Sequence, residues 1–258
     1  MDKKRLLVMD VGNTQTVFGV FLEDQLETDW RINSDQGKTA AEYAELIQNS
    51  CRSSGFDSES FSAVVISSVV PLLQDIFTDV CQTHMGISPI IVDEGIKTGM
   101  PMQVEAPHEV GADRIINTLA AYHLMGQACI VIDFGTATTF DCVSGKGEFL
   151  GGVIMPGIGI SAEALFRSAS KLPRVEIKKP KSFIGKNTVH CMQSGIFLGY
   201  VVMVDGMVAG IAQEMNEDVY VMATGGIAGI IAPETKTIQK VDSLLTLKGL
   251  KIIYDLNR

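Results

Sequence analysis

The sequence is short of positive charge. Its 258 residues include 21 lysines and arginines against 30 aspartates and glutamates, which gives a formal net charge of −9. A chain of this charge is a poor general nucleic-acid binder, because nucleic acids bind to a basic face. The deficit does not exclude an anionic substrate, since the charge around one site decides that. We therefore expect a small-molecule substrate and no nucleic-acid partner.

Cysteine is also scarce, and its spacing argues against the common metal and disulfide frameworks. The five cysteines form no C-x-x-C pair, and Cys129 and Cys142 lie in apolar, strand-like runs. This pattern is typical of buried, reduced thiols and not of a zinc site or a disulfide scaffold. It favours a cytoplasmic protein.

Long apolar runs are nearly absent. After the charged residues 2–5, a short apolar run ends at Asp10, which is too little for the apolar segment of a signal peptide. Residues 196–212 are almost wholly apolar but fall just short of a membrane span and carry Asp205 in their middle. We predict a buried helix there and no membrane segment.

The chain does contain one motif that is present twice, namely an apolar strand followed by an aspartate, a glycine and a hydroxyl-rich turn. The copies match at Asp10 and Asp133, Gly12 and Gly135, and Thr16 and Thr139. Such a turn lets backbone N–H groups and hydroxyls approach a phosphate, while the acid can hold a hydrated cation. A single Asp-x-Gly is ordinary strand-exit chemistry. Two copies predict a duplicated fold that clamps the phosphates of a nucleotide in a cleft.

The predicted elements repeat in the same way. Two sets of three strands are predicted, at residues 6–9, 17–22 and 26–32 and at residues 129–132, 138–143 and 148–154. Helices and a further strand follow each set. We predict an α/β fold of two domains packed around a cleft, residues 1–114 and residues 115–258.

Two further turns carry candidate binding groups. Gly225 and Gly226 follow a predicted strand, and paired glycines let an adenine or ribose lie against the backbone. In the sequence Gly-Ala-Asp-Arg at residues 111–114, Asp113 could accept a proton from a substrate hydroxyl and Arg114 could bind a carboxylate. A purely structural role in the turn before a helix explains the two glycines equally well, and a favourable charge at a helix N-terminus explains Asp113. The residues alone leave these interpretations open.

A long helix is predicted at residues 188–215, after a basic stretch at residues 171–186 that is either a solvated loop or an attractor of anionic substrates. Thr188 is its predicted N-cap, or else a substrate contact. Glycines recur along it at four-residue spacing, which lets helices approach closely. We expect a packed helix, with a dimer interface as one form of that packing.

Together these motifs resemble type III pantothenate kinase. The resemblance covers almost the whole chain, in the family's order, at residues 10–14, 67–71, 111–114, 133–139, 185–188 and 224–226. It implies the duplicated actin, sugar-kinase and heat-shock-ATPase fold, with two ribonuclease-H-like domains around a nucleotide cleft. It further implies ATP-dependent phosphorylation of pantothenate to 4′-phosphopantothenate, which opens coenzyme A biosynthesis. The implied enzyme is a cytoplasmic homodimer that needs Mg²⁺ and a monovalent cation, K⁺ or NH₄⁺.

The resemblance and the turn chemistry together give expected roles to individual residues. Asp113 matches the family's proton acceptor and Asp133 its monovalent-cation ligand, while Asp10 is expected to organise Mg²⁺ near the transferred phosphate. The expected ATP contacts are Asp10, Val11, Gly12, Asn13, Thr14, Gln15, Thr16, Val17, Thr136, Gly225 and Gly226. The expected pantothenate contacts are Val104, Gly111, Ala112, Asp113, Arg114 and Thr188. Val104 departs from the family, because many members carry a tyrosine there that contacts pantothenate.

Two alternatives stay open. Another kinase of this fold, acting on a sugar or acyl substrate, fits both phosphate turns, although residues 111–114 favour pantothenate. A regulatory or transcription-activating protein that binds nucleotide without turnover is the second, since relatives of the family include such activators. The presence of Asp10, Asp113 and Asp133 argues against it, because a pure binder needs no base.

Overall fold

The computed structural model describes residues 5–93 and 95–258, so most of the charged N-terminal stretch lies outside the described residues. Contacts divide the chain into two compact units. Unit 1 comprises Met1–Gly99, His108–Ala120 and Thr246–Arg258, and unit 2 comprises Met100–Pro107 and Ala121–Leu245. Both units are discontinuous in sequence, and the division of the chain at residue 114 stays a prediction.

Each unit is built on one five-stranded sheet. The strands of unit 1 are β1 (Arg5–Val11), β2 (Gln15–Leu22), β3 (Gln25–Asn33), β4 (Phe61–Ser68) and β5 (Ile90–Ile91). The strands of unit 2 are β6 (Cys129–Phe134), β7 (Ala137–Val143), β8 (Phe149–Pro156), β9 (Tyr220–Thr224) and β10 (Lys240–Val241).

The two sheets have the same strand order. It is β3-β2-β1-β4-β5 in unit 1 and β8-β7-β6-β9-β10 in unit 2. In each sheet the first three strands form two antiparallel hairpins, and the first strand also pairs in parallel with the fourth. The repeat in the sequence is thus a repeat of topology, and the predicted duplicated α/β fold is confirmed.

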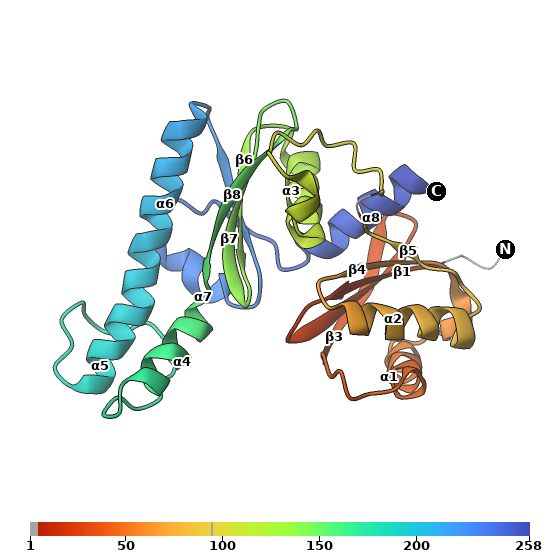
Figure 1. Cartoon of the computed structure of the whole chain (residues 1–258), viewed down its shortest axis with the longest axis horizontal. Helices are drawn as coiled ribbons and strands as arrows, with labels where there is room; N and C mark the ends of the chain where they lie inside the picture. Colours follow the sequence, from red (N-terminus) through yellow and green to blue (C-terminus); the bar gives the residue numbers. More distant parts are fainter. Residues whose placement is uncertain (1–4, 94) are drawn as a thin grey trace. The chain divides into compact units, whose positions relative to one another are not determined.

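Helices cover both faces of the unit 1 sheet (Figure 1). The helices of unit 1 are α1 (Ala40–Ser53), α2 (Pro71–Asp79) with the π-helical turn η2 (Val80–His84), α8 (Leu245–Asn257) and the first part of α3 (Ala112–Met125). Two short 3₁₀ turns are η1 (Ser58–Ser60) and η3 (Pro107–Glu109), and η3 lies where the chain passes from unit 2 to unit 1. Met9 of β1 shares a buried cluster with Tyr43 of α1 and Phe77 of α2. On the other face a Cβ built on Gly19 of β2 would lie 3.0 Å from Leu247 of α8. Alternate β1 side chains therefore face opposite helix layers.

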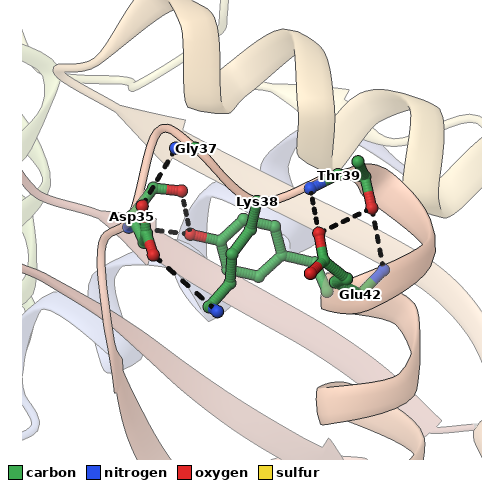
Figure 2. A network of polar contacts seen from close by, with 6 residues as sticks. Asp35, Gly37, Lys38, Thr39 and Glu42 are labelled. Carbon is green, nitrogen blue, oxygen red and sulfur yellow. Dashed lines mark hydrogen bonds and ion pairs between the residues drawn. The ribbon is translucent and has the colours of Figure 1, made fainter.

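A capping box fixes the start of α1 (Figure 2). The Thr39 side chain accepts a hydrogen bond from the Glu42 backbone N–H, and the Glu42 carboxylate accepts one from the Thr39 backbone N–H at 2.7 Å. The buried Tyr43 hydroxyl donates to the Asp35 carbonyl and accepts from the Asp35 N–H, both at 2.8 Å. These bonds satisfy N–H groups that a helix start leaves unpaired, and they hold the segment that follows β3.

In unit 2 one long helical segment covers a face of the sheet (Figure 1). The helices are α4 (Ile158–Ser168), α5 (Thr188–Gln193), the π-helical turn η4 (Ser194–Leu198), α6 (Gly199–Met215), α7 (Ala228–Ile231) and the 3₁₀ turn η5 (Ala232–Glu234). The stretch Thr188–Met215 is long and apolar enough to cross a membrane by length and composition alone. Its residues Tyr200, Val204 and Val208 are buried in one cluster with Ile132 of β6, as in the core helix of a globular protein.

The glycines of this helix were expected to pack, and within the described residues they do not. Gly195, Gly199, Gly206 and Gly210 are exposed, and a Cβ built on any of them would meet no atom of the described chain within 4 Å beyond its own helix. Val202, on the same face, is 58% exposed. The opposite face of the helix packs against the sheet, because it carries the bulky residues Tyr200, Val204 and Val208.

Candidate functional site

The turn between β1 and β2 is closed tightly around Gly12. The Gly12 N–H donates to the Gln15 carbonyl at 3.1 Å, and a Cβ built on Gly12 would lie only 2.9 Å from that oxygen. Asn13, Thr14 and Gln15 form an exposed tip. A glycine-closed turn that leaves polar groups exposed at a strand end is suited to bind an anion.

Two hydrogen bonds of Ser34, a residue that follows β3, hold this turn in place. The Ser34 hydroxyl donates to the Gly12 carbonyl at 2.7 Å and lies 3.0 Å from the Thr16 hydroxyl, which is fully buried. Ser34 directly precedes the segment held by Asp35 and Tyr43. The side chains of Thr16 and Val11 are therefore buried parts of the protein core at this turn. Only their backbone groups are available to contact a ligand.

The second copy of the motif forms the turn between β6 and β7. Its glycine makes the equivalent bond, from the Gly135 N–H to the Ala137 carbonyl at 3.1 Å. Thr136 is exposed, and its carbonyl accepts a bond from Gly157, the N-cap of α4, at 3.1 Å. The start of α4 thus lies against the turn.

The strand register corrects one detail of the alignment of the two motifs. Val11 pairs with Thr16 in β1–β2, whereas Phe134 pairs with Thr138 in β6–β7. The match of Thr16 to Thr139 is therefore wrong by one residue, because the first turn is one residue longer. Thr16 and Thr138 are equivalent, and both are buried; the Thr138 hydroxyl lies 2.7 Å from the Tyr200 hydroxyl.

Asp133 lies near the end of β6, flanked by two threonines and a glycine. Thr139 of β7 and Thr224 of β9 are its register partners on the two sides. Gly225 follows with a φ of +94°, and a Cβ there would lie 2.6 Å from Asp133 Oδ1 and from backbone atoms of Phe134. Only glycine fits, since an L side chain would be both strained and overlapping. The carboxylate and the threonine oxygens suit a hard, oxygen-loving cation.

Asp113 is the second residue of α3. Its Oδ1 accepts a hydrogen bond from the Arg114 backbone N–H at 2.9 Å and lies over Gly111, where a Cβ would be 2.6 Å away. Burial raises the pKa of the Asp113 carboxyl above its usual range, although the Arg114 N–H bond and the Arg114 charge act in the opposite direction. A carboxyl with a raised pKa is better matched to accept a proton near neutral pH.

The N-cap predicted at Thr188 is one residue off. Asn187 caps α5, because its side chain accepts a bond from the His190 N–H at 2.9 Å. Asn favours this position as strongly as any residue does. Thr188 is instead the first helical residue, and its side chain is exposed, which leaves its hydroxyl available for the other role considered, a substrate contact.

The two units gather different parts of the expected set. Unit 1 holds the Asp10–Val17 turn and the residues 111–114, while unit 2 brings Gly225 against Asp133 and holds Thr136, Gly226 and Thr188. Val104 also belongs to unit 2, where its side chain lies beside Gly151 at the edge strand β8. Neighbouring Met102 forms a parallel bridge with Phe149 of β8, so this segment extends the sheet.

Two residues of these sites were not predicted from the sequence. Ser34 supports the first turn from the end of β3, and only tertiary contacts reveal it. Asp141 is buried in β7 and accepts a bond from the Thr139 hydroxyl at 2.7 Å, so it extends the polar row that begins at Asp133. An acid at an inward strand position, two residues after a motif threonine, is the signal that could have indicated Asp141.

Known proteins match this chain along most of its sequence. A family model described as type III pantothenate kinase matches residues 6–210. Relatives named type III pantothenate kinase from Moorella thermoacetica and Geobacter sulfurreducens are both 49% identical to this chain, over 98% of it and 99% of their own length.

Solved structures share the fold at low identity. A Baf family transcriptional activator from Campylobacter jejuni has a TM-score of 0.61 at 18% identity, covering 97% of this chain and 98% of that one. A ROK hexokinase from Thermus thermophilus has a TM-score of 0.53 at 14% identity, covering 96% and 98%. The two therefore place the chain in a fold that sugar kinases also use.

Proposed function

Because the chain belongs to the type III pantothenate kinase family, we propose that it catalyses the ATP-dependent phosphorylation of pantothenate to 4′-phosphopantothenate, the first step of coenzyme A biosynthesis. The observation that carries this proposal is the 49% identity along 98% of the chain. That span includes both phosphate turns and residues 111–114. The same assignment supports a cytoplasmic location.

ATP phosphates are the ligand that the two glycine-closed turns fit best. The exposed residues 13–15 and Thr136 offer polar groups to phosphate, and Gly226, where a Cβ would meet no atom of the described chain within 4 Å, leaves room for the nucleoside. Mg²⁺ also fits, since it keeps several waters and needs only one or two carboxylates beside the phosphates. Asp10 supplies such a carboxylate, and the described part of the chain has no group of three acidic, histidine or cysteine side chains that would form a full cage. When bound, the ion offsets phosphate charge.

Asp133 is the proposed ligand of the monovalent cation. The carboxylate lies between two threonine-bearing strands and against a glycine that leaves space for it. K⁺ and NH₄⁺ both accept such an oxygen-rich surrounding, and a fixed positive charge beside the second phosphate turn would stabilise the transferring phosphoryl group.

Asp113 is the proposed general base. In this role its carboxylate takes the proton of the primary hydroxyl of pantothenate as that oxygen attacks the γ-phosphorus. Gly111 keeps space above the carboxylate, and the Arg114 N–H orients it. Arg114, Thr188 and Val104 are the proposed contacts for the rest of pantothenate, with Arg114 suited to its carboxylate.

The test is ADP release from Mg·ATP, measured with and without pantothenate, in K⁺ buffer and in Na⁺ buffer. We expect turnover only with pantothenate, 4′-phosphopantothenate as the product, and a lower rate in Na⁺. Asp133→Asn should remove the difference between the two cations, whereas Asp218→Asn, an exposed acid before β9, should keep it. Nucleotide binding without turnover would contradict the proposal and favour the regulatory alternative. A cation response that survives Asp133→Asn would contradict the Asp133 role.

We also propose that the chain acts as a homodimer through the exposed face of its long helix. That face carries Gly195, Gly199, Val202, Gly206 and Gly210, and only 33% of the apolar window of Thr188–Met215 is buried. An apolar helix face bare of large side chains allows a second helix to approach closely. A second copy of the chain is the partner that presents a matching face by symmetry.

Light scattering of the purified protein tests the dimer. We expect the mass of two chains at micromolar concentration, and the mass of one chain for Val202→Lys, because that substitution places a charge in the middle of the face. Val189→Lys, at an exposed position outside this row of small residues, is the control and should stay dimeric. A wild-type monomer would overturn the proposal.

A further inference from the structure

A buried hydroxyl beside Asp10 lacks any hydrogen-bond partner. Ser67 lies near the end of β4 and is 1% exposed, and its Oγ has no partner within the described structure. Most buried polar side chains are hydrogen-bonded, and one that is not costs free energy unless a water, an ion or a ligand completes it. This hydroxyl therefore requires an explanation.

The strand register places Ser67 next to Asp10. The two residues are direct partners in the parallel pairing of β1 with β4, following the pairs Val8 with Val65 and Leu7 with Val64. Neighbouring strands lie about 4.8 Å apart, and register partners project from the same face of a sheet. Ser67 and Asp10 thus stand side by side where parallel strands end, which is the usual place for a ligand in an α/β sheet.

The neighbouring serine, Ser68, differs from Ser67 because its hydroxyl is used by the local backbone. Ser68 projects to the opposite face, where its Oγ donates to the Val70 carbonyl and accepts from the Val70 N–H, both at 3.0 Å. These two bonds shape the entry into α2. One serine of the pair is therefore structural, while the other places its hydroxyl beside Asp10, where that hydroxyl has no hydrogen-bond partner among the described residues.

We propose that the Ser67 hydroxyl binds a water molecule in the hydration shell of the Mg²⁺ that accompanies ATP at Asp10. The inference rests on the proposed function, since it takes Mg·ATP as the ligand. Mg²⁺ gives up its waters reluctantly, so proteins hold it largely through hydrogen bonds to those waters. A hydroxyl accepts a bond from such a water, and it can donate its own proton to a neighbouring carboxylate or phosphate oxygen. Ser67 would thereby help Asp10 to fix where the hydrated Mg²⁺ lies.

The experiment is a titration of ADP, with and without Mg²⁺, by calorimetry, which needs no turnover. In the wild type, Mg²⁺ should tighten ADP binding. In Ser67→Ala the Mg²⁺ concentration for half of that effect should rise about fivefold, the factor expected for one ordinary hydrogen bond. ADP affinity in EDTA should not change. Ser67→Cys keeps the connectivity of the side chain with a slightly larger atom and is a poor acceptor, so it should behave as the alanine variant does.

Thermal unfolding of the ligand-free protein separates this role from a structural one. The single tryptophan, Trp30, lies in β3 and reports on unit 1. Ser67→Ala should unfold at the wild-type temperature or above it, because it removes an unsatisfied polar group. Ser68→Ala is the matched control and should show the reverse pattern, namely a lower unfolding temperature with an unchanged Mg²⁺ requirement.

Two results would overturn the inference. One is an unchanged Mg²⁺ requirement in Ser67→Ala, and the other is a wild type whose ADP binding does not respond to Mg²⁺. Failure of the kinase assignment looks different, since pantothenate-dependent turnover would then be absent while the calorimetric difference between wild type and Ser67→Ala persists.

Discussion

Asp113→Asn is expected to lower kcat by at least about 100-fold, the usual contribution of a positioned general base. Asparagine keeps the shape of the side chain and can still accept the Arg114 N–H bond, but it cannot take a proton at neutral pH. The Michaelis constant for ATP should change little, because Asp113 lies outside both phosphate turns. Steady-state assays of ADP release measure both constants. Glu109→Gln removes an exposed acid four residues earlier and should leave kcat unchanged.

The pH dependence gives an independent check of this role. Since burial raises the pKa of the Asp113 carboxyl, kcat/KM of the wild type should fall as the pH drops through that raised value. The residual activity of Asp113→Asn should lack this fall at low pH.

The effect of Asp113 on the stability of the folded protein also has a defined sign. A carboxyl whose pKa is higher in the folded state than in the unfolded state destabilises the fold once it ionises. Asp113→Asn should therefore be at least as stable as wild type above that pKa, and the difference should vanish in acid. A variant that is both inactive and unstable at neutral pH would contradict the catalytic role.

Gly225→Ala is expected to destabilise the protein by more than about 2 kcal/mol, the range of substitutions that force overlap at a special backbone conformation. The φ of Gly225 is +94°, and a Cβ would lie 2.6 Å from Asp133 Oδ1 and from two backbone atoms of Phe134. The overlap with the Phe134 backbone strains the end of β6 and the turn at Gly225, and the overlap with Asp133 Oδ1 forces the Asp133 carboxylate to shift as well. We therefore expect the K⁺ stimulation to disappear together with the stability.

Urea unfolding followed by circular dichroism measures the first effect, and the rate ratio between K⁺ and Na⁺ measures the second. Gly229→Ala is the matched control, because Gly229 is exposed in α7 and a Cβ there meets no atom of the described chain within 4 Å. That substitution should be neutral or slightly stabilising, since alanine is the better helix former. Wild-type stability in Gly225→Ala would mean that the turn can relax without moving Asp133.

The sequence predicted the elements that depend on local chemistry. In the sequence, Pro71 and the apolar residues that follow it at helical spacing predict a helix from residue 71 to about 84, and the structure has α2 and η2 over that range. Residues 39–52 also have helical spacing in the sequence, and Thr39 caps α1 in the structure. The repeated Asp-x-Gly turns predicted the duplication because such a turn needs the same few residues wherever it occurs. The sequence did not predict the strand register. Because the first turn is one residue longer than the second, the residue equivalent to Thr16 is Thr138 and not Thr139.

By itself the sequence determined the fold class and the family, and it predicted the reactive groups, because strand periodicity, turn glycines and acids are local properties of the chain. Only the tertiary structure decided what surrounds those groups. It placed Ser34 beneath Gly12, Gly225 against Asp133 and Ser67 beside Asp10, and it buried Asp141. These contacts join residues far apart in the chain. The packing of strands and helices sets them, and no pattern of neighbouring residues encodes which side chain another one will meet.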